Sequence, residues 1–345
     1  MSSLRSLANR LGLSTTTVSR ALDGYPDVAH GTRERVQALA RELNYHPNAA
    51  ARSLRKQKAD AVAVTLPSGT SHIGLAGIIN MLMDAGRTLA ADGLDLLMLP
   101  TEGHDSELDV LRRLVEGRRA DAVILVRTRR ADPRVAFLSE RGIPFVTHGR
   151  TDASIPHAFI DGDGAQGFRD ATAMLIGLGH QRIAHIAAPQ EFTFAFVRRA
   201  GWLAQMQAAG LGSTADEQIC EPTEAGGRAG AIRLLTRNAS PTALLCATDA
   251  MAIGALSAAK ELGLVPGRDI TIVGHDGLPS GAYTDPPLTT MQIDAADIGA
   301  RLARLLVSRI DGVPASQLQD LIAIKQVPRL THAPPVRDRR VKSRR

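Results

Sequence analysis

Apolar residues at the start of the chain recur at the spacing of a helical face. They fall at positions i, i+3, i+4 and i+7, namely Leu4, Leu7, Ala8 and Leu11. Gly12 predicts the end of this helix, and Ser14 is a good N-cap for a second helix with an apolar stripe of Val18, Ala21 and Leu22. Gly24, Tyr25 and Pro26 break the second helix, and the pattern predicts a third helix from Thr32 to Leu43.

Two helices joined by a short turn that contains glycine predict a helix-turn-helix, whose second helix fits the DNA major groove. The side chains expected at this interface are those of Ser14, Thr15, Thr16, Thr17, Ser19 and Arg20. Thr15 and Thr16 can contact base edges, and Arg20 can bind a guanine edge or a phosphate. Thr17 and Ser19 suit the phosphate backbone. The alternative is an exposed helix without a partner.

From Ala61 onward, short apolar runs alternate with stretches of helix length. The expected strands are Ala61–Leu66, Leu94–Leu99, Asp121–Val126, Phe145–Thr147, Ile183–Ala187, Ala243–Ala247 and Ile270–Val273. This alternation predicts an α/β fold with doubly wound parallel sheets, and the number of elements predicts two subdomains. A ligand cleft is expected at the carboxyl ends of the strands.

The distribution of charge separates the first part of the chain from the rest. Residues 1–58 hold 10 Lys and Arg against 4 Asp and Glu, whereas residues 59–336 hold 25 against 30. A basic module followed by a mildly acidic body suits a protein that neutralises DNA phosphates with one part only. Residues 337–345 are basic again, and we interpret residues 331–345 as a solvated tail.

Several classes of protein are disfavoured by what the sequence lacks. It shows neither a secretory signal pattern nor an apolar run of membrane length, so we expect a cytoplasmic protein without membrane contact. We found no complete catalytic motif and no metal-ligand spacing, and therefore expect no enzyme activity, cofactor or metal. Residues 161–164, Asp-Gly-Asp-Gly, are interpreted as a turn, and His148 and His180 as turn or capping residues.

Three stretches of the N-terminal sequence resemble the lactose-repressor (LacI/GalR) family. They are residues 11–22 (LGLSTTTVSRAL), 32–36 (TRERV) and 43–48 (LNYHPN). The resemblance implies that residues 47–58 form a hinge helix that folds on DNA, with Asn48 and Ala51 at the interface. By position, Leu54 is the leucine that inserts into the minor groove, a known way to kink DNA. A plain linker is the alternative.

The body carries the same resemblance in the order expected for the family. The matching stretches are residues 176–183, 198–202, 241–252 and 273–276, with 287–290. They imply a core like the type I periplasmic sugar-binding proteins, with two subdomains joined by three crossovers.

The resemblance also implies which residues contact a small effector. Arg198 and Asp276 match an arginine and an aspartate that bind effector, and this pair suits the hydroxyls of a sugar. The alternative is a structural ion pair. Thr248 and Asp163 are also expected to contact effector, although both depart from the family pattern. Thr248 stands where many relatives carry an asparagine, and Asp163 is followed by Gly164 instead of asparagine. Phe196, like Phe194 and Trp202, suits either stacking on a sugar or core packing.

Together these features predict residues 1–46 as the DNA-binding domain, 47–58 as the hinge and 59–330 as the effector core. The core is divided into residues 59–159 with 291–320, and residues 160–290 with 321–330. We expect a homodimer on a pseudo-palindromic operator, most simply a repressor of carbohydrate-utilisation genes that a sugar-like effector releases. A corepressor-dependent or activating regulator, an exported sugar-binding protein and a dehydrogenase are the alternatives.

Overall fold

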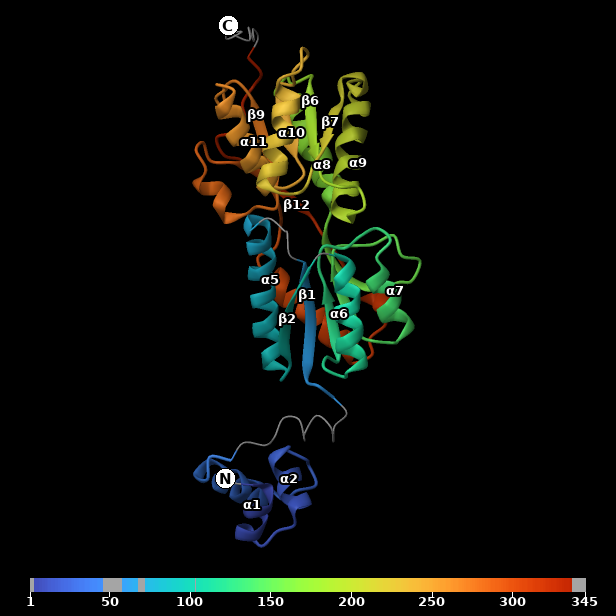
Figure 1. Ribbon diagram of the computed structural model, residues 1–345, viewed down its shortest axis with the longest axis vertical. Helices are drawn as coiled ribbons and strands as arrows, with labels where there is room; N and C mark the ends of the chain where they lie inside the picture. Colours follow the sequence, from blue (N-terminus) through green and yellow to red (C-terminus); the bar gives the residue numbers. More distant parts are fainter. Residues whose placement is uncertain (1–2, 46–57, 68–71, 103, 337–345) are drawn as a thin grey trace. The chain divides into compact units, whose positions relative to one another are not determined.

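The computed structural model describes residues 3–45, 58–67, 72–102 and 104–336 (Figure 1). The chain divides into two compact units, Met1–Ala59 and Asp60–Arg345. The predicted hinge residues Asn48, Ala51 and Leu54 and the basic residues 337–345 lie outside the described residues. Within those residues, no helix combines the length and the apolar character needed to span a membrane.

The first unit contains the three predicted helices, α1 (Leu4–Leu11), α2 (Thr15–Leu22) and α3 (His30–Glu42). Leu7, Val18 and Val36 are fully buried between them. Gly12 ends α1 in the left-handed conformation (φ 65°), which glycine adopts without a steric penalty, and Ser14 then caps α2. The turn between α1 and α2 is therefore as short as the helix-turn-helix prediction required.

Two details of this unit differ from the prediction. Ser19 was expected on the outer face of α2, but it is only 8% exposed because it lies beside Val18 on the face that packs in the core. The third helix begins at His30 rather than Thr32, without a side-chain cap. Arg33 instead holds the preceding loop, since its guanidinium donates to the carbonyl oxygens of Tyr25 (2.7 Å) and Val28 (3.2 Å).

The described residues of the second unit form two six-stranded sheets. The first sheet contains β1 (Ala61–Pro67), β2 (Asp95–Thr101), β3 (Ala122–Leu125), β4 (Phe145–His148), β5 (Ala158–Gly162) and β11 (Gln319–Ile322). Its order is β11-β5-β4-β3-β1-β2, and every pair is parallel. We call this sheet and its helices the first lobe.

The second sheet contains β6 (Ile183–Ala187), β7 (Asp216–Ile219), β8 (Ala243–Cys246), β9 (Thr271–His275), β10 (Thr289–Ile293) and β12 (Ile324–Val327). Its order is β12-β10-β9-β8-β6-β7, and only the edge strand β12 is antiparallel to its neighbour. This sheet and its helices form the second lobe. The prediction of two doubly wound, mainly parallel sheets is confirmed.

Helices cover the sheets of both lobes (Figure 1). The first lobe carries α5 (His72–Ala91), α6 (His104–Glu116), α7 (Pro133–Glu140) and α12 (Ile298–Ile310). The second lobe carries α8 (Gly164–Gly177), α9 (Thr193–Ala208), α10 (Glu224–Leu235) and α11 (Asp249–Glu261). Within the lobes, α5 packs on α12, α8 on α9 and α10 on α11. The core of the first lobe therefore combines Val62, Leu82 and Leu302 from distant parts of the chain.

The chain crosses between the lobes three times, each time slightly later than predicted. The crossings follow Gly162, Ile293 and Ile322, because β5 still belongs to the first sheet and β10 to the second. The Asp-Gly-Asp-Gly stretch is not a simple turn. Its first two residues end β5, and the Asp163 side chain caps α8 by accepting the Gln166 N–H.

The end of the described chain is docked on the second lobe, so the expected tail does not begin at residue 331. Thr331 is fully buried, and its hydroxyl donates to the Ile272 carbonyl oxygen (2.6 Å). The Ala333 carbonyl oxygen lies 2.9 Å from His180 Nε2 and accepts from the Thr271 hydroxyl. His180 therefore joins two segments that are distant in sequence.

Candidate ligand cavity and DNA-recognition helix

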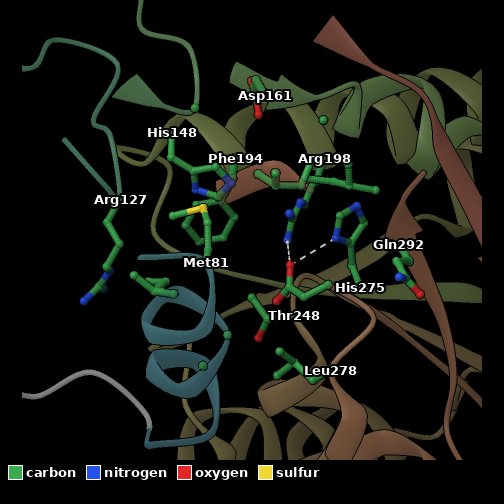
Figure 2. A pocket seen from close by; sticks show the side chains of 18 of the residues that line it. Met81, Arg127, His148, Asp161, Phe194, Arg198, Thr248, His275, Leu278 and Gln292 are labelled. Carbon is green, nitrogen blue, oxygen red and sulfur yellow. Dashed lines mark hydrogen bonds and ion pairs between the residues drawn. The ribbon is translucent and has the colours of Figure 1, made fainter. Parts of the chain in front are cut away.

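A cavity of about 320 Å³ lies between the two lobes (Figure 2). Its polar side chains sit at the carboxyl ends of parallel strands, with His148 at the end of β4, Asp161 in β5 and His275 at the end of β9. Parts of α5, including Ile78 and Met81, supply an apolar wall. The cavity thus lies where doubly wound folds bind their ligands.

Arg198 and Asp276 meet inside this cavity. Arg198 Nη1 lies 3.1 Å from Asp276 Oδ1 and donates to the Ala247 carbonyl oxygen at 2.6 Å, while Arg198 Nε has no hydrogen-bond partner. Burial alone would raise the pKa of Asp276, but the Arg198 charge and the hydrogen bonds from His275 and Arg198 outweigh it and hold this pKa below its ordinary value. A charged carboxylate therefore lines the cavity, held in place by a guanidinium that also bonds the Ala247 carbonyl oxygen.

The backbone of Asp276 adopts a conformation that side-chain-bearing residues rarely take. Its φ is 122°, and Gly277 follows with φ 69°. The Asp276 N–H donates to the Met291 carbonyl oxygen at 2.8 Å, which fixes this segment on β10. A strained residue that carries a charged side chain into a cavity is typical of a functional site.

Two neutral histidines accompany this pair. Burial lowers the pKa of His275 to about 4, and its Nδ1 lies 3.1 Å from Asp276 Oδ1. Burial also lowers the pKa of His148, although the charges of Asp161 and Asp276 act in the opposite direction. Both rings are therefore uncharged near neutral pH, and His275 uses its Nδ1 to hold Asp276 in place. His148 was expected only as a turn or capping residue, and its position at the end of a predicted strand was the one signal that could have placed it here.

Asp249 anchors the loop that lines one side of the cavity. It is fully buried, accepts the Thr290 hydroxyl at 2.6 Å, and accepts the Leu278 N–H at 2.7 Å. Burial and the nearby Asp276 raise its pKa to about 7. Asp249 was not expected at the site, because no sequence pattern indicates that a residue of the first helical turn is buried beneath a second aspartate.

The structure brings only part of the predicted effector set to the cavity. Arg198, Asp276 and Thr248 line it, although the Thr248 hydroxyl also caps α11 by accepting the Met251 N–H at 3.2 Å. Asp163 and Phe196 are not among the lining residues, whereas Asp161 and Phe194 are. Phe196 is 37% exposed beneath the Arg130 guanidinium. Trp202 is a core residue that donates to the Ile183 carbonyl oxygen.

In the first unit, the start of α2 presents exposed hydroxyls. Ser14 caps the helix by accepting the Thr17 N–H at 3.0 Å, and Thr15 and Thr16 are exposed. Arg20 is held by Asp27, to which its Nη2 and Nε donate at 2.5 and 3.3 Å, and it lies 4.7 Å over the Tyr25 ring. Of the six described residues expected at the DNA, the buried Ser19 is the one whose side chain faces the core.

A helix-turn-helix joined to a two-lobed α/β unit with a polar cavity defines a DNA-binding regulator that responds to a small molecule. Comparison with known proteins agrees. Residues 3–48 match the model of the bacterial regulatory proteins of the lacI family, and residues 172–331 match a periplasmic binding protein-like domain.

Full-length relatives share both parts. The chain is 34% identical over 319 residues to the HTH-type transcriptional regulator RafR of Escherichia coli, covering 92% of this chain and 94% of RafR. The lac repressor dimer bound to operator and the anti-inducer ONPF has a TM-score of 0.80 at 26% identity, covering 96% of this chain and 99% of that one. The CelR–cellobiose complex has a TM-score of 0.71 at 27% identity, covering 96% and 100%. The chain belongs to the lacI family of bacterial transcriptional regulators.

Proposed function

We propose that this regulator represses carbohydrate-utilisation genes and leaves its operator when a small neutral sugar occupies the cavity. The observation that carries the proposal is the Arg198–Asp276 pair, whose Nη1 and Oδ1 lie 3.1 Å apart among the residues that line the cavity. A carboxylate can accept from two adjacent hydroxyls while a guanidinium donates to sugar oxygens. The CelR relative, solved with cellobiose, supports a carbohydrate ligand.

The other lining residues support an uncharged ligand. Asp161 is already paired with Arg150, whose Nε donates to it at 2.8 Å, so the cavity does not offer this carboxylate as an isolated charge. His148 and His275 are neutral, and Ile78 and Met81 offer an apolar surface to the C–H face of a sugar ring. A neutral polyol matches this mixture better than an anion or a cation does.

For DNA binding we propose that two copies of the chain place their α2 helices in successive major grooves of a pseudo-palindromic operator. Thr15 and Thr16 would contact base edges, with Ser14, Thr17 and Arg20 closer to the phosphates. The solved lac repressor dimer on its operator supports this arrangement. From sequence alone, Asn48, Ala51 and Leu54 remain proposed contacts in the minor groove.

Effector release requires that the sugar bind the DNA-free state more tightly than the DNA-bound state. A difference of about 1–3 kcal/mol gives roughly 5- to 150-fold weaker operator binding. The experiment begins with selection of operator DNA from a random pool by the purified full chain. Gel-shift titrations with a panel of neutral mono- and disaccharides that includes cellobiose then follow.

Arg198→Ala should bind the selected DNA as the wild type does but lose release by the sugar, because it lacks the donor in the cavity. Arg199→Ala is the matched control, since the neighbouring Arg199 pairs with Glu217 on the surface. Normal release of Arg198→Ala would refute the site. A sugar that strengthens operator binding would indicate a corepressor, and a pool with no enriched sequence would favour a sugar-binding protein without DNA recognition.

A further inference from the structure

Two segments from different lobes meet beside the cavity. Residues 127–130 follow β3 in the first lobe, and residues 191–196 lead into the first turn of α9 in the second lobe. The Arg130 N–H donates to the Glu191 carbonyl oxygen at 2.8 Å, and the Thr193 N–H donates to the Thr128 carbonyl oxygen at 3.1 Å. Arg129 and Phe192 thereby form an antiparallel bridge. We call this meeting of the two segments the inter-lobe contact.

Cation–aromatic stacking reinforces the inter-lobe contact. The Arg130 guanidinium carbon lies 3.8 Å from the Phe196 ring centroid, and that of Arg127 lies 5.3 Å from the buried Phe192 ring. Each such pair contributes about 0.5–2 kcal/mol, depending on its exposure. Arg130 and Phe196 do not line the cavity, so they can act on a ligand only through other residues.

The contact continues to the effector pair. Phe192 stacks on Phe194 at 5.8 Å between centroids, and the Arg198 guanidinium carbon lies 5.0 Å from the Phe194 centroid. Phe194 and Arg198 both line the cavity and both belong to the first two turns of α9. Because α9 has no side-chain N-cap, the inter-lobe contact is what holds its first turn.

The first-lobe segment is preformed. Arg134 is buried, and its guanidinium donates to Asp132 at 2.9 and 2.7 Å, to Glu107 at 2.5 Å and to the Val126 carbonyl oxygen at 3.2 Å. This network holds Arg127 in the left-handed region (φ 53°), which few residues other than glycine adopt. All these Arg134 contacts come from the first lobe itself, so they hold the segment without any residue of the second lobe.

We infer that the inter-lobe contact positions the first turn of α9, and with it Phe194 and Arg198, so that Arg130 and Phe196 are positioning residues of the ligand site. This inference rests on the proposed function where it concerns sugar affinity. The local effect on α9 does not depend on any ligand.

The test uses the full chain carrying Phe196→Leu or Arg130→Ala. Phe196→Leu keeps an apolar side chain and removes the aromatic ring. Two variants serve as controls. Asp152→Asn removes the ion pair of Arg130 with Asp152 (2.7 Å) but leaves the stack, and Arg141→Ala removes an Arg–Phe stack of 4.4 Å that lies within the first lobe.

The first measurement is hydrogen exchange of the Arg130, Thr193 and Phe196 amides in the ligand-free protein. Both positioning variants should speed exchange at these amides by about 3- to 10-fold, since the stack that stabilises them is lost. The two controls should exchange like the wild type. Unchanged exchange in Phe196→Leu and Arg130→Ala would overturn the inference.

The second measurement is calorimetric titration with the sugar that releases operator DNA, cellobiose being tried first. Both variants should bind it about 3- to 10-fold more weakly, and the double variant should lose little more than either single one, because both changes remove the same stack. Faster exchange with wild-type affinity would overturn the positioning role. If no sugar binds the wild type, the proposed function fails, while the exchange measurement still decides whether the contact holds α9.

Discussion

Asp249 is the residue whose environment departs most from that of an ordinary aspartate. Its carboxylate lies behind the cavity, with Asp276 as a neighbour and only the Thr290 hydroxyl and the Leu278 N–H as compensating donors. Burial thus raises its pKa from the ordinary 3.8 to about 7. At a pH between these two pKa values, the folded protein holds a proton on Asp249 that it releases on unfolding. The free energy of unfolding must therefore depend on pH in this range.

Asp249→Asn tests this dependence. Below about pH 4 both folded and unfolded wild type keep the proton, whereas between pH 4 and 7 only the folded state does, so the wild type loses stability as pH rises. The stability of Asp249→Asn relative to the wild type should therefore increase from pH 5 to pH 7 and level off above. Urea unfolding at pH 5, 6, 7 and 8 measures the difference. Burial lowers the pKa of His185 and His275, so their contribution to stability rises with pH. This contribution cancels in the difference between the two proteins, because both contain these histidines. A difference that is flat with pH would contradict the raised pKa.

At the residue scale, the sequence could indicate Arg198 and Asp276, but it could not show which of two nearby similar residues lines the cavity. Phe194 and Phe196 differ by two positions, or about 200° around a helix, so only one can face the cavity. The sequence does not show which, because no side-chain cap marks the start of α9. Asp161 and Asp163 were likewise indistinguishable until β5 was seen to end at Gly162 and α8 to begin at Gly164.

At the scale of elements, the predictable strands are those with continuous apolar runs. All seven expected strands are present, and each has a mainly apolar sequence. Among the described residues, five strands were not predicted, namely β5, β7, β10, β11 and β12. The internal strands β5 (Ala-Phe-Ile-Asp-Gly) and β10 (Thr-Thr-Met-Gln-Ile) have apolar runs that polar residues interrupt. The edge strand β7 reads Asp-Glu-Gln-Ile, and β12 reads Ile-Lys-Gln-Val. Their place in a sheet depends on neighbours that are remote in sequence, and short polar segments carry no local sign of this.

Gly201 sets how closely α9 approaches α8. A Cβ atom at this position would lie 2.1 Å from the Ala165 carbonyl oxygen, so the two helices could not keep their separation. The glycine of the Arg-x-x-Gly-Trp stretch is therefore required by the same packing that places Arg198 over Gly164.

Gly201→Ala should lower the free energy of unfolding by about 1–3 kcal/mol, because the added methyl group is forced against backbone. Gly177→Ala, in the last turn of α8 with open space around it, is the control and should be neutral or stabilising by up to about 1 kcal/mol. Urea unfolding of the full chain compares the two. Equal stabilities for both variants would show that α8 and α9 can separate without cost.

At the scale of the whole molecule, exposed apolar side chains point to association of two chains. Tyr283 is 89% exposed in the short helical turn after β9, and Met83 and Met98 are exposed on α5 and β2 of the first lobe. Single exposed apolar residues are common, but a dimeric operator-binding protein would cover such side chains.

Light scattering should therefore give about twice the chain mass of 36.7 kDa, as expected for a dimer. Tyr283→Asp should shift the mass toward that of one chain at low micromolar concentration, because a buried unpaired carboxylate is costly. Ile219→Asp is the control, since Ile219 is also exposed (52%) but lies on the edge strand β7. A mass four times that of one chain would reject the dimer. If Tyr283→Asp had the same mass as the wild type, the interface would have to lie elsewhere.

The three crossings between the lobes also constrain how the chain can be made. The core of the first lobe needs Leu302 and Leu306 of α12, and its sheet ends with β11, so neither is complete until more than 300 residues have been synthesised. The helix-turn-helix unit has its own core and can fold soon after it leaves the ribosome. The growing chain thus carries a folded DNA-recognition module while the apolar face that α12 covers is still exposed, and we expect aggregation to compete with folding most at this stage.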